Sequence, residues 1–117
     1  MEATATGASA EDLAVAALEA AGYQIIARNW ECQRGELDVV ARDGDVLVFV
    51  EVRSRADPAH GHAAEMVTPA KRASVERVAQ MYLVLERPVF ERCRFDVVAI
   101  TGDQVDLIAD AWRTSRT

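Results

Sequence analysis

A hairpin pattern over residues 35–55 constrains the fold of this chain more than any other part of its sequence. The stretch reads GELDVVARDGDVLVFVEVRSR, and two apolar-rich runs flank the pair Asp43-Gly44. Asp-Gly between alternating runs is a strong signal for a two-residue hairpin loop, because glycine adopts positive φ without steric cost. The sequence therefore predicts antiparallel strands over residues 36–42 and 46–54, with Asp43-Gly44 at the centre of the loop.

This loop position places Arg42 opposite Asp45 and assigns each side chain to one face of the sheet. Directly opposed residues of an antiparallel pair point to the same side, and side chains alternate along each strand. One predicted face is wholly apolar and carries Leu37, Val39, Ala41, Val46, Val48, Val50 and Val52. The other predicted face mixes apolar and charged residues and carries Glu36, Asp38, Val40, Leu47, Phe49, Glu51 and Arg53. A loop of four residues on the same centre would leave both faces unchanged.

Carboxylates gather on the mixed face. In this register Asp38 and Glu51 are diagonal neighbours, roughly 7–8 Å apart at the backbone. Carboxylates on a half-buried face repel one another and need a counter-charge, and a divalent metal ion is a natural one. The alternative is an exposed polar face on which Arg53 offsets Glu51. The pattern alone leaves both interpretations open.

Length and composition are those of an ordinary globular domain. The chain has 117 residues, 50% of them hydrophobic and 27% charged, which suffices for one domain with one core. Its two cysteines, Cys32 and Cys93, lack metal-site spacing and indicate reduced thiols in a cytoplasmic protein. We expect no secretory signal in residues 1–12, and the longest apolar run, residues 46–50, is too short to span a membrane.

The charge balance bears on the choice of partner. A net charge of −6 argues against a polyanion-binding surface over the whole chain. If Glu36, Asp38 and Glu51 hold a metal, however, the remaining surface around Lys71 and several arginines is locally basic. The acidic charge therefore weakens a nucleic-acid-binding interpretation without removing it.

The rest of the chain carries alternating helix and strand signals. They predict helices over residues 10–21 and 68–87, strands over 23–30, 94–100 and 104–109, a turn over 31–34 and a loop over 56–67. A strand after a helix can return parallel to the third strand through a right-handed crossover. The predicted fold class is α/β, a mixed five-stranded sheet flanked by helices in the order αβββαββ. It forms one domain with a core over 9–109 and tails over 1–8 and 110–117.

Other charged side chains have two interpretations each. Glu11 lies in the first turn of its predicted helix, where an acid is favourable, but it also lies on the face turned to the core and could reach the acidic patch. His60, His62 and Glu65 could ligate a metal, although their loose spacing in a small polar segment favours an ordinary loop. Lys71 is on the polar side of the second helix, facing either solvent or a phosphate.

The order of elements, with Glu11 ahead of Asp38 and of Glu51-Val52-Arg53, resembles the PD-(D/E)XK nuclease core. From about residue 11 to residue 100 the chain more closely resembles the uncharacterised bacterial YraN-like family, whose nearest relatives with an activity are, by fold, archaeal Holliday-junction resolvases. The likeness is carried by Glu11-Asp12-Leu13-Ala14, Gly22-Tyr23, Asn29-Trp30, Gly35-Glu36-Leu37-Asp38, Val48-Phe49-Val50-Glu51-Val52-Arg53, Thr68-Pro69-Ala70-Lys71 and Arg94-Phe95-Asp96-Val97-Val98.

The resemblance implies a restriction-endonuclease-like protein that binds nucleic acid, and the expected nucleic acid is DNA, including branched DNA. It also implies hydrolysis of phosphodiester bonds with Mg²⁺ or Mn²⁺. It implies that Asp38, Glu51 and the backbone carbonyl of Val52 ligate the metal, and that Glu11 is directed at it. To these residues we add Glu36, which could help to position a water molecule. The resemblance also implies a homodimer.

Arg53 departs from the family motif, whose last letter is lysine. Arginine keeps its proton at any ordinary pH, so Arg53 cannot be a general base, although it can orient a hydroxide or stabilise phosphate charge. Arg55 and Lys71 are candidate phosphate contacts, and solvated surface charges are the alternative. Three function classes stay open: a nuclease, a nucleic-acid-binding module with a degenerate site, and a protein-interaction adaptor that retains only the fold.

Overall fold

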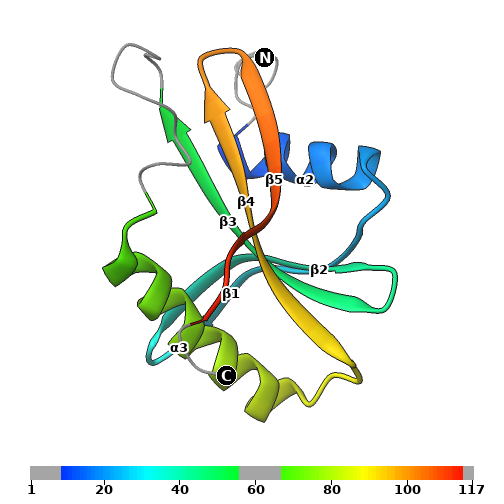
Figure 1. Ribbon diagram of the computed structural model, residues 1–117, viewed down its shortest axis with the longest axis vertical. Coiled ribbons are helices and arrows are strands. Elements are labelled where there is room, and N and C mark those ends of the chain that lie inside the picture. The colour runs from blue at the N-terminus through cyan, green and yellow to red at the C-terminus, as the bar shows by residue number, and fades with distance from the viewer. Residues whose placement is uncertain (1–8, 56–66, 115–117) are drawn as a thin grey trace, which may run out of the picture.

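The computed structural model describes residues 9–55 and 67–114, which form two helices and five strands. In chain order they are α2 (Ala10–Ala20), β1 (Gln24–Cys32), β2 (Gly35–Asp43), β3 (Val46–Arg55), α3 (Pro69–Glu86), β4 (Arg92–Thr101) and β5 (Gln104–Trp112). The strands lie side by side in the order β1-β2-β3-β4-β5, with β3 and β4 parallel and the other neighbours antiparallel (Figure 1). The predicted αβββαββ order and the mixed sheet of a restriction-endonuclease-like core are therefore confirmed.

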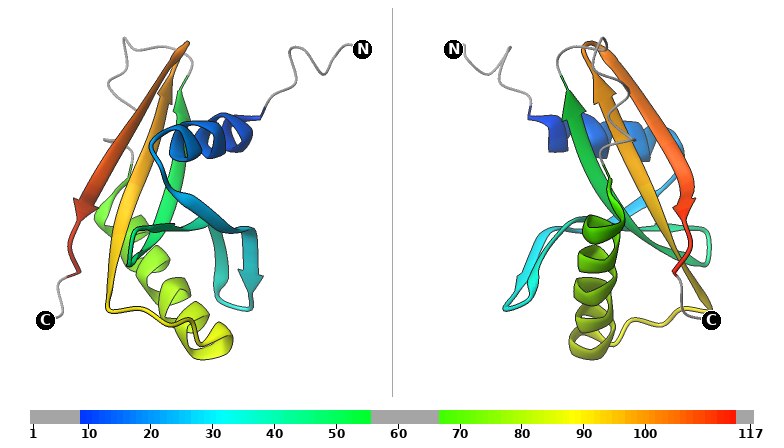
Figure 2. Two further views of the ribbon diagram at one scale, coloured as in Figure 1. Left: turned by 90° about the vertical axis from the view of Figure 1, so that its right-hand side faces the viewer. Right: turned by 60° about the vertical axis from the view of Figure 1, so that its left-hand side comes forward.

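The two helices cover opposite faces of the sheet (Figure 2). Against α2 lies a cluster of buried residues that includes Ala14, Leu18, Val39, Ala41, Val48 and Val50. Against α3 lies a second cluster that includes Val40, Leu47, Phe49, Val75, Val78 and Tyr82. Residues of β2 and β3 thus alternate between two cores, as the period-two pattern of the hairpin predicts.

Side-chain caps fix where each helix begins. Ser9 Oγ accepts a hydrogen bond from the backbone N–H of Asp12 at 3.0 Å, and the Asp12 carboxylate accepts one from the Ser9 N–H at 3.4 Å. Thr68 Oγ1 accepts from the backbone N–H of Lys71 at 3.1 Å, so Lys71 lies in the first turn of α3. Neither described helix has the length and apolar composition needed to cross a bilayer.

The register of the β2–β3 hairpin differs from the predicted register by two residues. Asp43 pairs with Val46 and Arg42 with Leu47, so the loop is Gly44-Asp45 and not Asp43-Gly44. Gly44 has φ of 63° at the first loop position, where type II′ hairpin turns place glycine. Because a shift of two residues preserves the alternation of side chains, the predicted faces survive the correction.

Leu37 is the exception to the predicted faces. It packs in the α3 core, whereas Val39 packs in the α2 core. The cause lies at Asp38, whose Oδ2 accepts the backbone N–H of Val52 at 2.9 Å beyond the last regular β2–β3 pair, Val39–Val50. A side chain replaces the backbone ladder there, and the end of the β1–β2 hairpin turns toward α3 (Figure 1).

β5 continues three residues beyond the predicted end at Ala109. A bulge and a positive φ of 55° at Asp110 let the strand turn and continue to Trp112. The Trp112 ring stacks on Phe95 with centroids 4.9 Å apart, and its Nε1–H donates to Glu76 of α3 at 2.8 Å. The predicted tail over residues 110–117 was therefore wrong for its first residues, because a buried aromatic side chain ties them to the core.

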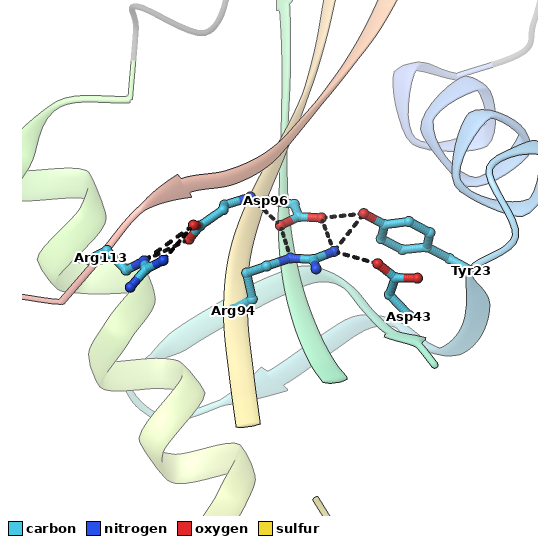
Figure 3. A network of polar contacts seen from close by, with 6 residues as sticks. Tyr23, Asp43, Arg94, Asp96 and Arg113 are labelled. Atoms are coloured by element: carbon cyan, nitrogen blue, oxygen red, sulfur yellow. Dashed lines mark hydrogen bonds and ion pairs between the residues drawn. The ribbon is translucent and has the colours of Figure 1, made fainter. Parts of the chain in front are cut away.

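A buried polar network links the strands on the α2 side (Figure 3). Asp96 is fully buried, and its carboxylate accepts from Tyr23 Oη at 2.7 Å, from Arg94 Nε at 2.8 Å and from the backbone N–H of Asp110 at 2.8 Å. Arg94 Nη2 also donates to Asp43 Oδ2 at 3.0 Å. None of these contacts follows from a local sequence pattern, and the network joins Tyr23, just before β1, to β2, β4 and β5.

Candidate functional site

Glu51 is a buried carboxylate in the middle strand of the sheet. It is 4% exposed and faces α3, on the same side of β3 as Phe49. Its Oε2 lies 3.1 Å from Arg53 Nη2, two residues along β3, and 3.5 Å from Lys71 Nζ, in the first turn of α3. One buried acid is thus neutralised by a cation from its own strand and a cation from the helix above it.

Asp38 lies beside Glu51. Its Oδ2 accepts the backbone N–H of Val52, the residue after Glu51 in β3, at 2.9 Å. Burial and then the charge of Asp38 raise the pKa of Glu51 to about 7, against the opposing charges of Lys71 and Arg53. The structure therefore brings these two predicted acids together on one face of the sheet.

Further acids rim the pair. Glu31, which we expected in a turn, lies in β1 directly opposite Glu36, because β1 continues to Cys32. Partial loss of hydration raises the pKa of Glu36, and the charges of Asp38, Glu31 and Glu11 raise it further. Like charges directly opposite one another are destabilising in a sheet, so this rim favours a cation in its vicinity.

Glu11 does not join the pair as a third close ligand. It belongs to α2, and its Oε2 lies 3.3 Å from Arg28 Nε of β1, which also binds Asp12. Among residues 9–55 and 67–114, no three acidic, histidine or cysteine side chains are grouped to hold a metal ion. The predicted meeting of three acids is absent from this part of the chain, since an arginine on the edge strand binds Glu11.

Arg53 has one donor in use and one without a partner. Its Nη2 contacts Glu51, whereas its Nε is buried and has no hydrogen-bond acceptor among the described residues. Arg55 ends β3, and its side chain lies outside the described part of the structure. His60, His62 and Glu65 also lie outside it.

The sequence placed Lys71 on the polar side of its helix and missed the contact with Glu51. The spacing between Lys71 and the core residues of the same helix does indicate that Lys71 faces the sheet. Thr68 fixes the helix start, and Lys71 then precedes the core residues Val75 and Val78 by four and seven positions, which are positions on one helix face. Arg72, the next residue, is instead held by stacking on the ring of Trp112, with the guanidinium carbon 5.6 Å from the ring centroid.

The residues present fit a divalent cation. Asp38 and Glu51 offer adjacent hard oxygen donors, and Mg²⁺ is commonly bound by one or two carboxylates with water and substrate phosphate completing its shell. Burial is the main cause of the raised pKa of Glu51, and the charge of Asp38 adds to it, so a cation beside both acids would favour the ionised form of Glu51. The neighbouring Arg53 and Lys71 can contact an anion.

Comparison with known proteins relates most of the chain to one family. A model described as "Uncharacterised protein family UPF0102" matches residues 10–100. A UPF0102 protein of Syntrophus aciditrophicus is 41% identical over 111 residues, which cover 92% of this chain and 87% of the relative. One of Ralstonia nicotianae is 44% identical over 114 residues, with coverage of 94% and 88%. One of Chloroflexus aurantiacus is 49% identical over 97 residues, with coverage of 82% and 78%.

Proposed function

The chain belongs to the uncharacterised protein family UPF0102, the YraN-like family that its sequence resembles, and we propose that it is a metal-dependent nuclease-like protein acting on DNA. One observation carries the proposal. A buried acid, Glu51, lies beside a second acid, Asp38, and contacts two cations, Arg53 and Lys71. Two acids suit a divalent cation, and two cations suit the phosphate that such an ion would act upon.

The residues of the site have distinct roles in this proposal. Asp38, Glu51 and the carbonyl of Val52 hold Mg²⁺ or Mn²⁺, which when bound acidifies water and offsets charge on the phosphoryl group. The hydrogen bond from the Val52 N–H fixes the Asp38 carboxylate beside β3. Arg53 and Lys71 bind phosphate oxygens, and Arg55, the last residue of β3, is a further candidate phosphate contact. Glu36 lies at the rim, where it can orient a water molecule, whereas Glu11 is paired with Arg28 and has no role in this proposal.

A second function is favoured by a separate observation. Glu51 is already neutralised by Arg53 and Lys71 without any metal ion, and Arg53 cannot serve as a base. The same site is therefore compatible with a module that binds nucleic acid through its cations and does not cut. Its binding would weaken as salt rises, because phosphate contacts release counterions, and would not need a metal.

The two functions are separated by one set of assays. The protein is incubated with linear, flapped and four-way DNA in Mg²⁺, in Mn²⁺ and in EDTA, and both cutting and binding are measured. Asp38→Ala is compared with Asp45→Ala, which removes a 74% exposed acid from the loop of the same hairpin. Cutting that requires metal and is lost in Asp38→Ala alone supports the nuclease. Binding in EDTA without cutting supports the binding module, and absence of both refutes the two proposals together.

A further inference from the structure

The two cations of the site lie nearer to solvent than the acid they neutralise. Glu51 has 4% of its side chain exposed, whereas Arg53 has 29% and Lys71 has 39%. Both contact the same oxygen, Oε2, at 3.1 Å and 3.5 Å. A ligand that approaches from solvent therefore meets the cations before it meets the acid.

We infer that Arg53 and Lys71 exchange partners, from Glu51 to a phosphate of the nucleic acid, when a divalent cation engages Glu51. This inference rests on the proposed function and adds to it a coupling between metal binding and DNA binding. The divalent cation and the phosphodiester bind cooperatively, since each favours the state in which the internal ion pairs are broken. Such coupling is reciprocal, so DNA raises the affinity for the cation by the factor by which the cation raises the affinity for DNA.

The charge balance of the site supports this exchange. Asp38, Glu51, Arg53 and Lys71 together carry no net charge, so a divalent cation leaves two positive charges that an anion can offset. The Arg53 Nε is buried and lacks an acceptor among the described residues, and it gains one when the side chain leaves Glu51 and turns its Nε–H to a phosphate oxygen. A phosphate also offers several oxygens, whereas both cations now share a single carboxylate oxygen.

The exchange predicts an unusual result for a metal-ligand substitution. Glu51→Gln removes a ligand of the cation, but it also removes the charge that holds Arg53 and Lys71. Without metal, this variant should bind DNA more tightly than the unchanged protein does. If Arg53 and Lys71 do not transfer to DNA, Glu51→Gln should raise the affinity for DNA no more than the loss of an exposed acid from the same hairpin does.

The test is the affinity for a fluorescently labelled four-way DNA, measured by anisotropy in EDTA and in Ca²⁺, which occupies oxygen sites and permits binding without cutting. In EDTA, Glu51→Gln should bind about tenfold more tightly than the unchanged protein, the factor expected for freed charge-assisted contacts. Asp45→Asn, which removes the same charge from an exposed position in the loop of the β2–β3 hairpin, should change the affinity by at most about threefold. Adding Lys71→Met to Glu51→Gln should abolish the gain.

Ca²⁺ should tighten binding by the unchanged protein about tenfold and leave Glu51→Gln unaffected. The inference is overturned if Glu51→Gln binds no more tightly than Asp45→Asn in EDTA, or if Lys71→Met leaves the gain intact. In either case DNA binding by the unchanged protein still supports the proposed function. If no variant binds DNA in either condition, the proposed function fails and the inference fails with it.

Discussion

The carboxylate of Asp96 joins β4 to Tyr23 and to β5, and its removal is the most direct test of the fold. Asp96 is fully buried and accepts hydrogen bonds from Tyr23, Arg94 and the backbone of Asp110 (Figure 3). The change Asp96→Ala would leave the partly buried Arg94 with Asp43 as its remaining acidic partner. It would also leave the Tyr23 hydroxyl without its acceptor.

The expected loss follows from the burial of the network. Breaking a buried ion pair by removing one partner costs about 3–5 kcal/mol of unfolding free energy, because the other charge stays buried. For a chain of this length, that corresponds to a fall in Tm of roughly 12–20 °C. Tyr23→Phe should cost less, about 1–2 kcal/mol, since Asp96 then keeps Arg94 and the Asp110 N–H.

Urea unfolding of the single and double variants measures these costs. In the Asp96→Ala background, Tyr23→Phe should cost less, under about 1 kcal/mol, because the hydroxyl has lost its acceptor and keeps only the hydrogen bond that Arg94 Nη2 donates to it at 2.7 Å. Arg113→Ala is the matched control, since that side chain is 84% exposed and pairs with Asp110 at the surface, and the midpoint should not move. A loss below about 1 kcal/mol for Asp96→Ala, or an equal cost of Tyr23→Phe in both backgrounds, would refute the reasoning.

Three further predictions concern the site and the hairpin. Mn²⁺ affinity, measured by calorimetry, should rise by up to about tenfold per pH unit below pH 7 and level off above it. The reason is the raised pKa of Glu51, because the Glu51 carboxyl must lose its proton before it can bind the metal ion. The Asp38→Ala variant should bind Mn²⁺ at least tenfold more weakly. Glu51→Gln should gain stability relative to the unchanged protein as pH rises from about 4.5 to 7. An acid whose pKa is raised in the folded state stabilises the fold at pH values below its unfolded-state pKa, and it loses that contribution as pH rises through its folded-state pKa. A difference in urea midpoint that does not change with pH would contradict this. Gly35→Ala should lower the free energy of unfolding by about 2–4 kcal/mol, because φ of Gly35 is 142° and an added Cβ would lie 3.1 Å from Val78 Cγ2. Gly44→Ala should lower it by about 1–2 kcal/mol in the same urea assay, because φ of Gly44 is 63° but an added Cβ would meet open space.

Local sequence patterns predicted the parts of this fold that depend on neighbouring residues. The period-two alternation placed Glu51 and Arg53 on the face opposite Val50, and this held although the loop was placed one residue too early. The Thr68-Pro69 signal predicted the start of α3, and the spacing to Val75 contained the position of Lys71. These features follow from backbone geometry over fewer than ten residues.

Contacts between distant segments could not be predicted in the same way. Tyr23 and Asp96 are 73 residues apart, and nothing in either local pattern links them. Leu37 changed faces because the Asp38 carboxylate replaced a backbone partner of β3, and Trp112 joined the sheet because Phe95 and Glu76 provided contacts for it. Glu11 was assigned to the metal on the basis of resemblance, whereas Arg28, on another element, is the cation that it contacts.

The middle position of β3 has a consequence for how the site would survive thermal fluctuation. β3 is flanked by β2 and β4, whereas β1 and β5 each have one neighbour, so fraying of the sheet begins at the outer strands. Amide hydrogens around Glu51 should therefore exchange with solvent more slowly than those at the margins. An acid carried by the last strand to open keeps its surroundings while the periphery loosens, so the proposed metal site would keep its geometry during fluctuations of the outer strands.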